Sequence, residues 1–362
     1  MSDLHFIPGL ELSQHLYEEA VRPILEEHFV ELPYSAALIG AGSEVLGFDT
    51  PQSMDHDWGP RLLLFLAEAD IDTYRPRLEQ ALARELPPGI HGFPLDMAVV
   101  QRSDQALDLQ TLGNLASHSV RLHTVRSFVR TVLNVEYDQE WQAEDWLSFP
   151  SQYLRSLTGG RVFHDGLGQL TVLREKLSYY PQDIWLYLLA AQWQRIDQEE
   201  PFMGRCGQAG DELGSRLVAA RLVKDLMRLC FLMERRYAPY IKWLGTAFAQ
   251  LECAGQLAPL LMQVLEASPW EERQKPLCAV YEYAAEMHNR LAITEPLSTK
   301  VSHFFGRPFL VSQAARFVEA IRARITDVEV KALPEHLGSV DQFTDSTDAL
   351  NQIHRVKRVY KD

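Results

Sequence analysis

The apolar pattern changes its period along the first hundred residues. Residues 11–29 carry apolar side chains at intervals of four or five, which predicts an amphipathic helix that bends or restarts at Pro23. The short apolar runs at 35–40 and 61–67 are bounded by Gly, Pro and acidic residues, as is typical of buried strands. Residues 73–87 return to helical spacing and end in prolines.

Further along the chain the pattern becomes mostly helical. Short apolar runs predict two more strands at 93–100 and 106–112 and a third at 161–164, and helices otherwise dominate from about residue 113 to residue 325. The glycine-rich stretch 204–214 predicts a hinge, or a loop that opens a long helix. Residues 331–362 are polar and weakly periodic, which predicts a loosely attached tail.

These elements predict an α+β fold class, in which a small mixed sheet with flanking helices is followed by an all-α helical bundle. The 362 residues, 46% of them hydrophobic, are enough for two domains. We expect an α/β domain at 1–150, a helical domain at 151–330 and the tail at 331–362.

Charge and cysteine usage exclude several classes of protein. The net charge of -14 argues against a duplex nucleic acid partner, which needs a basic face, although it would suit a small cationic substrate or a well-solvated surface. The cysteines lie more than twenty residues apart, which favours neither a disulfide framework nor a zinc knuckle: Cys206, Cys230, Cys253 and Cys278. Without a signal-like N-terminus or a long apolar run, we expect a cytoplasmic protein with no membrane partner.

Two aspartates precede the second apolar run. In an extended strand alternate side chains project to the same face, so Asp55 and Asp57 would direct both carboxylates to one point. Carboxylates that close repel each other unless a cation lies between them. Such oxygen ligands suit Mg²⁺, which substrate phosphates often complete. The pair therefore predicts a Mg²⁺ site for a nucleoside triphosphate.

A small corner follows the first apolar run. Ser43 lies twelve residues before Asp55, directly after Gly42. Glycine lets another group approach the backbone closely, and N–H donors at a helix start favour phosphate. Gly42 and Ser43 are therefore candidate nucleotide-binding residues.

Residues 42–59, GSEVLGFDTPQSMDHDWG, resemble the signature of the polymerase-β-like nucleotidyltransferase superfamily. In that superfamily, which includes aminoglycoside nucleotidyltransferases, an apolar residue and Gly-Ser precede a D-x-D pair. His56 departs from the pattern, because an apolar residue usually stands there. Most of residues 35–325, including GRVFHDGLG and YIKWLGTAF, is similar to a bacterial nucleotidyltransferase-like family of undefined function with a C-terminal helical domain. The resemblance implies a nucleotidyltransferase fold but no particular acceptor.

The resemblance also implies a third carboxylate, from a neighbouring strand. Asp108 in 106–112 is the preferred candidate because its surroundings match the related family, and Asp96 in 93–100 is the alternative. Either residue could instead be an ordinary acid at a strand edge. A third carboxylate would join Asp55 and Asp57 as a catalytic and metal-binding residue.

The helical half offers further candidates. Lys242 stands between Tyr240 and Trp243 in the family-like motif, so it could meet phosphate while an aromatic ring stacks on a base. A cationic stripe at helical spacing could neutralise a triphosphate or be a solvent face paired with Asp225 and Glu234: Arg221, Lys224, Arg228 and Arg235. Asp211 and Glu212 could cap a helix or bind acceptor amines.

Together these residues predict Mg²⁺-dependent transfer of a nucleoside monophosphate from a nucleoside triphosphate, with ATP the expected donor, to the hydroxyl of a small-molecule or protein acceptor. Asp108 would orient or deprotonate that hydroxyl. The alternative is a nucleotide- or partner-binding module, antitoxin- or sensor-like, that lacks turnover. The third carboxylate separates the two hypotheses, because binding can persist without it.

Overall fold

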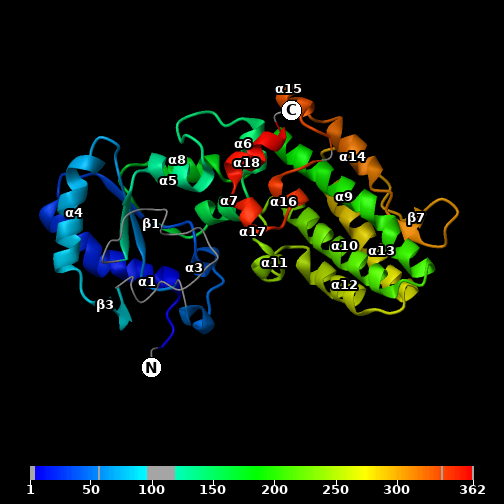
Figure 1. Ribbon diagram of the computed structural model, residues 1–362, viewed down its shortest axis with the longest axis horizontal. Helices are drawn as coiled ribbons and strands as arrows, with labels where there is room; N and C mark the ends of the chain where they lie inside the picture. The colour runs from blue at the N-terminus through cyan, green and yellow to red at the C-terminus, as the bar shows by residue number, and fades with distance from the viewer. Residues whose placement is uncertain (1–4, 56–57, 96–118, 336, 361–362) are drawn as a thin grey trace. The chain divides into compact units, whose positions relative to one another are not determined.

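The computed structural model describes residues 5–55, 58–95, 119–335 and 337–360. The chain forms two compact units, the first from residues 1–141 and 152–178 and the second from residues 142–151 and 179–362 (Figure 1). The first unit holds a small mixed sheet among helices and the second is mostly helical. The predicted α+β class is confirmed.

The sheet of the first unit has the strand order β5-β2-β1-β6. Its strands are β1 (Tyr34–Leu38), β2 (Leu62–Leu66), β5 (Val120–His123) and β6 (Arg161–Asp165). β1 is antiparallel to both β2 and β6, whereas β2 and β5 are parallel. The strands predicted at 35–40, 61–67 and 161–164 are confirmed. β5 lies where helix was expected, because a four-residue strand is too short to show its own period.

The unit boundaries differ from the expected single division near residue 150. β6 pairs with β1, so residues after 151 return to the sheet of the first unit. Of the strand predicted at 93–100, β4 (Phe93–Pro94) pairs with β3 (Gly89–Ile90) in a small hairpin. Residues 96–100 and the strand predicted at 106–112 lie outside the described residues.

The predicted N-terminal helix is confirmed over Gly9–His28 and contains a π-helical segment. It consists of α1 (Gly9–His15), the π-helix η1 (Leu16–Val21) and α2 (Arg22–His28). Pro23 lies in the first turn of α2, directly after the π-helical segment. A π-bulge before a proline accommodates the missing N–H and the bulk of the ring. The helix predicted at 73–87 is α4 (Ile71–Glu85).

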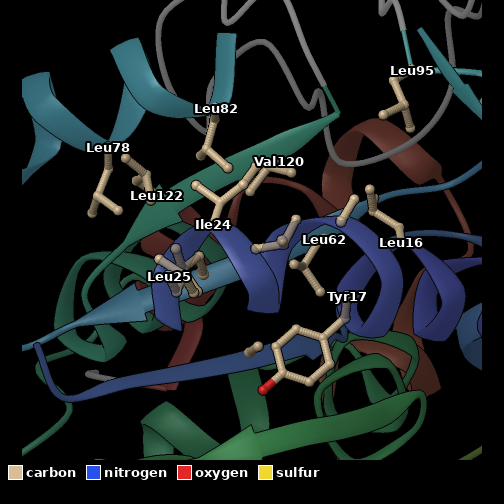
Figure 2. Close-up of a cluster of buried hydrophobic side chains, with 14 of the residues drawn as sticks. Leu16, Tyr17, Ile24, Leu25, Leu62, Leu78, Leu82, Leu95, Val120 and Leu122 are labelled. Carbon is tan, nitrogen blue, oxygen red and sulfur yellow. The ribbon is translucent and has the colours of Figure 1, made fainter. Parts of the chain in front are cut away.

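The core of the first unit lies between these helices and the sheet. Figure 2 shows Leu78 and Leu82 of α4 directed toward Val120 and Leu122 of β5, with Ile24 of α2 beside them. The other face of β2 is also covered, since the Phe65 ring packs on Phe128 of α5 (Val125–Leu133) with centroids 5.4 Å apart. Burial on both faces explains the continuous apolar run of β2.

Short helices complete the first unit. They are α3 (Ser43–Leu46), the 3-10 helix η2 (Pro51–Asp55), most of α7 (Ser151–Thr158) and α8 (Gln169–Lys176). Asp165 accepts hydrogen bonds from Ser35 Oγ at 2.6 Å and Thr171 N at 2.8 Å, so it joins β6 to β1 and to the first turn of α8. This acid therefore has a structural role.

The second unit is a helical bundle, as the sequence predicts. Two long helices, α9 (Gln182–Gln208) and α10 (Glu212–Met233), follow each other and pack together. The remaining elements are α6 (Ala143–Ser148), α11 (Ile241–Phe248), α12 (Ala254–Glu266), α13 (Trp270–Arg290), β7 (Ser302–His303), β8 (Leu310–Val311), α14 (Ala315–Arg322), α15 (Val328–Ala332), α16 (Val340–Phe343), α17 (Thr347–Leu350), α18 (Ile353–Val356) and η5 (Lys357–Tyr360).

The glycine-rich stretch 204–214 is mostly helix, so the predicted hinge is wrong, and the alternative, a loop that opens a long helix, is confirmed only for the short connection before α10. Only residues 209–211 separate α9 from α10. A Cβ at Gly204 would come within 2.5 Å of the Phe309 ring, and one at Gly207 within 2.1 Å of the Trp270 ring. These glycines therefore serve close packing. Asp211 caps α10 by accepting from Gly214 N at 2.7 Å, as one interpretation of the sequence had it.

The tail expected to be loosely attached is instead packed into the second unit. Val340, Ile353 and Val356 are buried, and the buried Tyr360 hydroxyl donates to Gly338 O at 2.9 Å. Lys357 Nζ donates to Asp145 Oδ1 at 2.5 Å. Helices of four residues are too short to show periodicity, which is why the sequence of the tail reads as irregular.

Within the described residues, no helix is both long enough and apolar enough to cross a membrane.

Candidate functional site

The Gly42–Ser43 corner lies at one end of the sheet. At this end β1 finishes at Leu38, and β2, β5 and β6 begin. The register pairs Ala37 with Leu63, Leu38 with Arg161, and Leu62 with Val120. The chain therefore leaves β1 into Gly42 and Ser43 beside the point where residues 58–61 enter β2.

The corner needs glycine for two reasons. Gly42 has a φ of 131°, and a Cβ on it would lie 2.5 Å from Arg61 Nη2 and 2.6 Å from Glu44 Oε2. An L side chain would be strained and would also clash. Gly40, with a φ of 93°, donates its N–H to Ser156 O at 3.0 Å. Ser43 is half-buried and begins α3.

A buried ion pair between Arg61 and Glu44 lies against the Gly42–Ser43 corner. The Arg61 guanidinium is hydrogen-bonded to Glu44 and also donates to Ala41 O at 3.2 Å. Burial raises the pKa of the Glu44 carboxyl, and the positive charge of Arg61 opposes that rise. Among the residues that the structure describes, Glu44 Oε2 and Arg61 Nε have no hydrogen-bond partner. The pair ties the corner to the first residues before β2.

The segment that carries the aspartate pair is fixed on both sides. Asp49 Oδ2 accepts from Trp58 Nε1 at 3.0 Å and from Gly9 N at 2.7 Å. Trp58 is 6% exposed and packs on Phe6 and Phe93, with ring centroids 5.5 Å and 5.2 Å away. The hydrogen bond between Asp49 and Trp58 therefore joins the residues that flank the 3-10 helix η2. The sequence interpretation singled out none of Glu44, Asp49, Trp58 and Arg61 for this role.

Asp55 does not begin an extended strand. It is the last residue of the 3-10 helix η2, and β2 starts only at Leu62. The alternation argument that placed Asp55 and Asp57 on one strand face is thus wrong at Asp55, because Pro51 favours a helical start to this segment. Asp57, Asp96 and Asp108 lie outside the described residues. The metal-binding roles of these three residues and of Asp55 stay predictions.

Lys242 belongs to the second unit. It is exposed on the first turn of α11, and its Nζ lies 5.1 Å from the ring centroid of Trp243. The expected aromatic neighbour is therefore present. Its contact with nucleotide stays a prediction.

The cationic stripe is paired within the second unit, and only its first three residues lie on α10, because Arg235 follows the end of that helix. Arg221 and Lys224 form ion pairs with Glu199 at 2.5 Å and Asp345 at 2.7 Å. The Arg235 guanidinium lies 3.7 Å from the ring centroid of Trp185. The expected partners of the stripe, Asp225 and Glu234, make other contacts. Asp225 binds Arg195 at 3.1 Å, and Glu234 accepts backbone N–H groups of residues 252 and 253. These contacts favour the structural interpretation of the stripe.

Arg228, the remaining residue of the stripe, lines a small cavity of about 30 Å³ together with Asp341, Gln192 and Tyr180. Arg228 Nη1 lies 4.0 Å from Asp341 Oδ1, and Arg228 Nε has no hydrogen-bond partner among the described residues. Burial raises the pKa of Asp341, whereas Arg228 and a hydrogen bond from Ser151 oppose that rise. The cavity has room for a water molecule or the end of a small polar group. Asp341 belongs to the tail, so the sequence pattern did not indicate this site.

Comparison with known proteins finds a family match over part of the chain and a similar solved structure. A family model described as a domain of unknown function, DUF4037, matches residues 146–244, which include Lys242. Among solved structures, the chain is similar to a nucleotidyltransferase-like protein from Exiguobacterium sibiricum 255-15, with 13% identity over 82% of this chain and 97% of that chain. The TM-score between the two structures is 0.32. A search of curated proteins found no match.

Proposed function

We propose that this protein transfers a nucleoside monophosphate from a nucleoside triphosphate, with ATP as the expected donor, to the hydroxyl of a small-molecule or protein acceptor. One observation carries the proposal. The register of β1 and β2 pairs the end of β1, which leads into Gly42 and Ser43, with the start of β2. The chain enters β2 after the Asp55–Asp57 segment. Candidate phosphate donors and candidate metal ligands thus belong to neighbouring segments.

The residue types suit a magnesium ion as the proposed cofactor. Asp55 and Asp57 would supply hard carboxylate oxygens, and Asp49 and Trp58, which flank them in the sequence, are joined by a hydrogen bond. Asp55 and Asp57 would hold the ion, with Asp108 as the preferred third ligand and Asp96 as its alternative. When bound, Mg²⁺ would neutralise triphosphate charge and stabilise the entering and leaving oxygens.

The chain's own groups would bind and orient the reactants. Gly42 N–H and the Ser43 N–H and hydroxyl would donate to phosphate oxygens. Asp108 would accept the proton of the acceptor hydroxyl, whose oxygen forms a bond to the α-phosphorus as the bond to pyrophosphate breaks. Lys242 and its aromatic neighbour Trp243 stay candidates for nucleotide contact within the second unit.

The test uses the full chain, Mg²⁺ and α-labelled ATP, with cell extract as the source of acceptor and mass spectrometry of the labelled product. Asp55→Asn and Asp57→Asn should each lower the rate by roughly 10²-fold or more, because each removes charge stabilisation from the transition state. The matched control is Asp72→Asn, an exposed acid in the first turn of α4, which should retain the wild-type rate.

Two results would count against the proposal. Label incorporation that persists in Asp57→Asn would remove the metal site from the mechanism. A Mg²⁺-dependent thermal shift with ATP that is lost in both variants, while the wild-type protein forms no product, would favour the binding module without turnover.

A further inference from the structure

Three side chains outside the proposed catalytic region converge on the surface of the first unit. His15 is the last residue of α1, Glu19 lies in the π-helix η1, and His91 lies in the turn between β3 and β4. His15 Nδ1 is 2.8 Å from Glu19 Oε1, and His91 Nε2 is 3.1 Å and 3.2 Å from the two Glu19 oxygens. All three candidate ligand atoms lie within 4.8 Å of one another. We propose that His15, Glu19 and His91 bind a divalent transition metal of the Zn²⁺ class.

The distances suit such an ion. With metal–ligand bonds of about 2.0–2.1 Å, a tetrahedral site keeps its ligand atoms roughly 3.3 Å apart. The spacings of His91 from Glu19 are close to this value, and His15 Nδ1, 2.8 Å from Glu19 Oε1, would move apart from Glu19 when the ion binds. Three protein ligands leave a fourth position for water, because all three side chains reach the solvent.

The ligand types separate this site from the proposed magnesium site. Two imidazoles and one carboxylate favour zinc, copper or nickel, whereas Mg²⁺ prefers oxygen ligands and retains water. The two sites are therefore chemically distinct.

The hairpin holds His91 in position. His91 has a φ of 50°, which a residue other than glycine rarely adopts, and Gly92 follows with a φ of 88°. The turn thereby places the His91 ring 4.4 Å from the His15 ring, between centroids. Metal-binding histidines usually donate their second ring N–H to an outer carboxylate. Glu11 Oε1, 3.9 Å from His15 Nε2, is placed to take this role after a small side-chain adjustment.

Hydrogen bonds alone also account for part of this geometry. The bonds from His91 and His15 lower the pKa of Glu19, so the cluster has favourable contacts before any ion binds. A second cluster gives the comparison. Glu27, His28 and Glu85 also lie within ligand distance of one another, but they offer one imidazole, and Arg84 already donates to Glu85 at 3.1 Å. This cluster is the matched control.

The test is calorimetric titration of the full-length protein with Zn²⁺ alone. His91→Asn removes the hairpin ligand and keeps a residue that tolerates positive φ. We expect His91→Asn and His15→Gln to weaken one Zn²⁺ site by more than about tenfold, since loss of even an outer-shell partner has an effect of that size. His28→Gln should bind Zn²⁺ as the wild-type protein does.

Two further readouts make the result specific. Co²⁺ in place of Zn²⁺ should produce visible absorption bands in the wild-type protein that disappear in His91→Asn. Asp57→Asn should retain the site, which separates this inference from the proposed transfer reaction. The inference is overturned if the wild-type protein does not bind Zn²⁺, if His91→Asn binds it equally well, or if His28→Gln has the same effect as His91→Asn.

Discussion

At the scale of single residues, the candidate site depends on contacts that arise from distant positions in the chain. Gly42 has no side chain, and the space that a side chain would fill is occupied by Arg61 and Glu44. The Gly-Ser pattern indicates a corner that phosphate could approach. The structure adds a buried ion pair beneath it, because β1 and β2 run antiparallel and bring residue 61 back to residue 44.

Gly42→Ala should destabilise the first unit by about 1–3 kcal/mol, because the new methyl group combines backbone strain with a clash against Arg61. Gly47→Ala isolates the contribution of strain. Gly47 also has a positive φ, 73°, but a Cβ there would meet nothing within 4 Å. Urea denaturation should show a larger loss of unfolding free energy for Gly42→Ala than for Gly47→Ala. Equal losses would show that the Arg61–Glu44 contact contributes nothing.

At the scale of elements, length decided how well the sequence could be interpreted. The five-residue apolar run of β2 and the fifteen-residue helix α4 show their periods clearly. β5 and the short helices of the tail have only four residues each, so the same method did not detect them. The glycines of 204–214 led to a different error, the predicted hinge. Gly204 and Gly207 are instead helical residues that permit close packing.

Gly207→Ala should destabilise the second unit by about 1–3 kcal/mol, because the Trp270 ring leaves no room for a methyl group. Gly245 in α11 is the control, since a Cβ there would meet nothing within 4 Å. Gly245→Ala should be neutral or stabilising by up to about 1 kcal/mol, as alanine favours a helix over glycine. Thermal and urea unfolding measure both effects. A neutral Gly207→Ala would show that the contact with Trp270 does not restrict this position.

At the scale of the whole molecule, the chain passes between the two units more than once. Residues 152–178 return to the first unit because β6 completes its sheet, and the tail belongs to the second unit. Asp341, from the tail, faces Arg228 of α10 in the small cavity. The C-terminal residues are therefore part of the folded bundle.

Tyr360→Ala should destabilise the second unit by about 3–5 kcal/mol, because the ring is 7% exposed and its hydroxyl donates to Gly338 O. Val359→Ala is the control, as the neighbouring side chain is 48% exposed and should contribute less than about 0.5 kcal/mol. Denaturant unfolding, followed by circular dichroism, compares the two variants. Equal stability of both would mean that the tail is loosely attached after all.

The sequence by itself determined the α+β class, the apolar strands β1 and β2, the long helices and the order of Gly42, Ser43, Asp55 and Asp57. Each of these follows from local periodicity or from neighbouring residues, which the chain carries at every position. Only the tertiary structure decided that Glu44 meets Arg61, that Asp49 binds Trp58, that Asp55 ends a 3-10 helix and that the tail is packed. It also brought His91 to His15 and Glu19. Such contacts depend on strand register and hairpin position, which bring together residues that no local pattern relates.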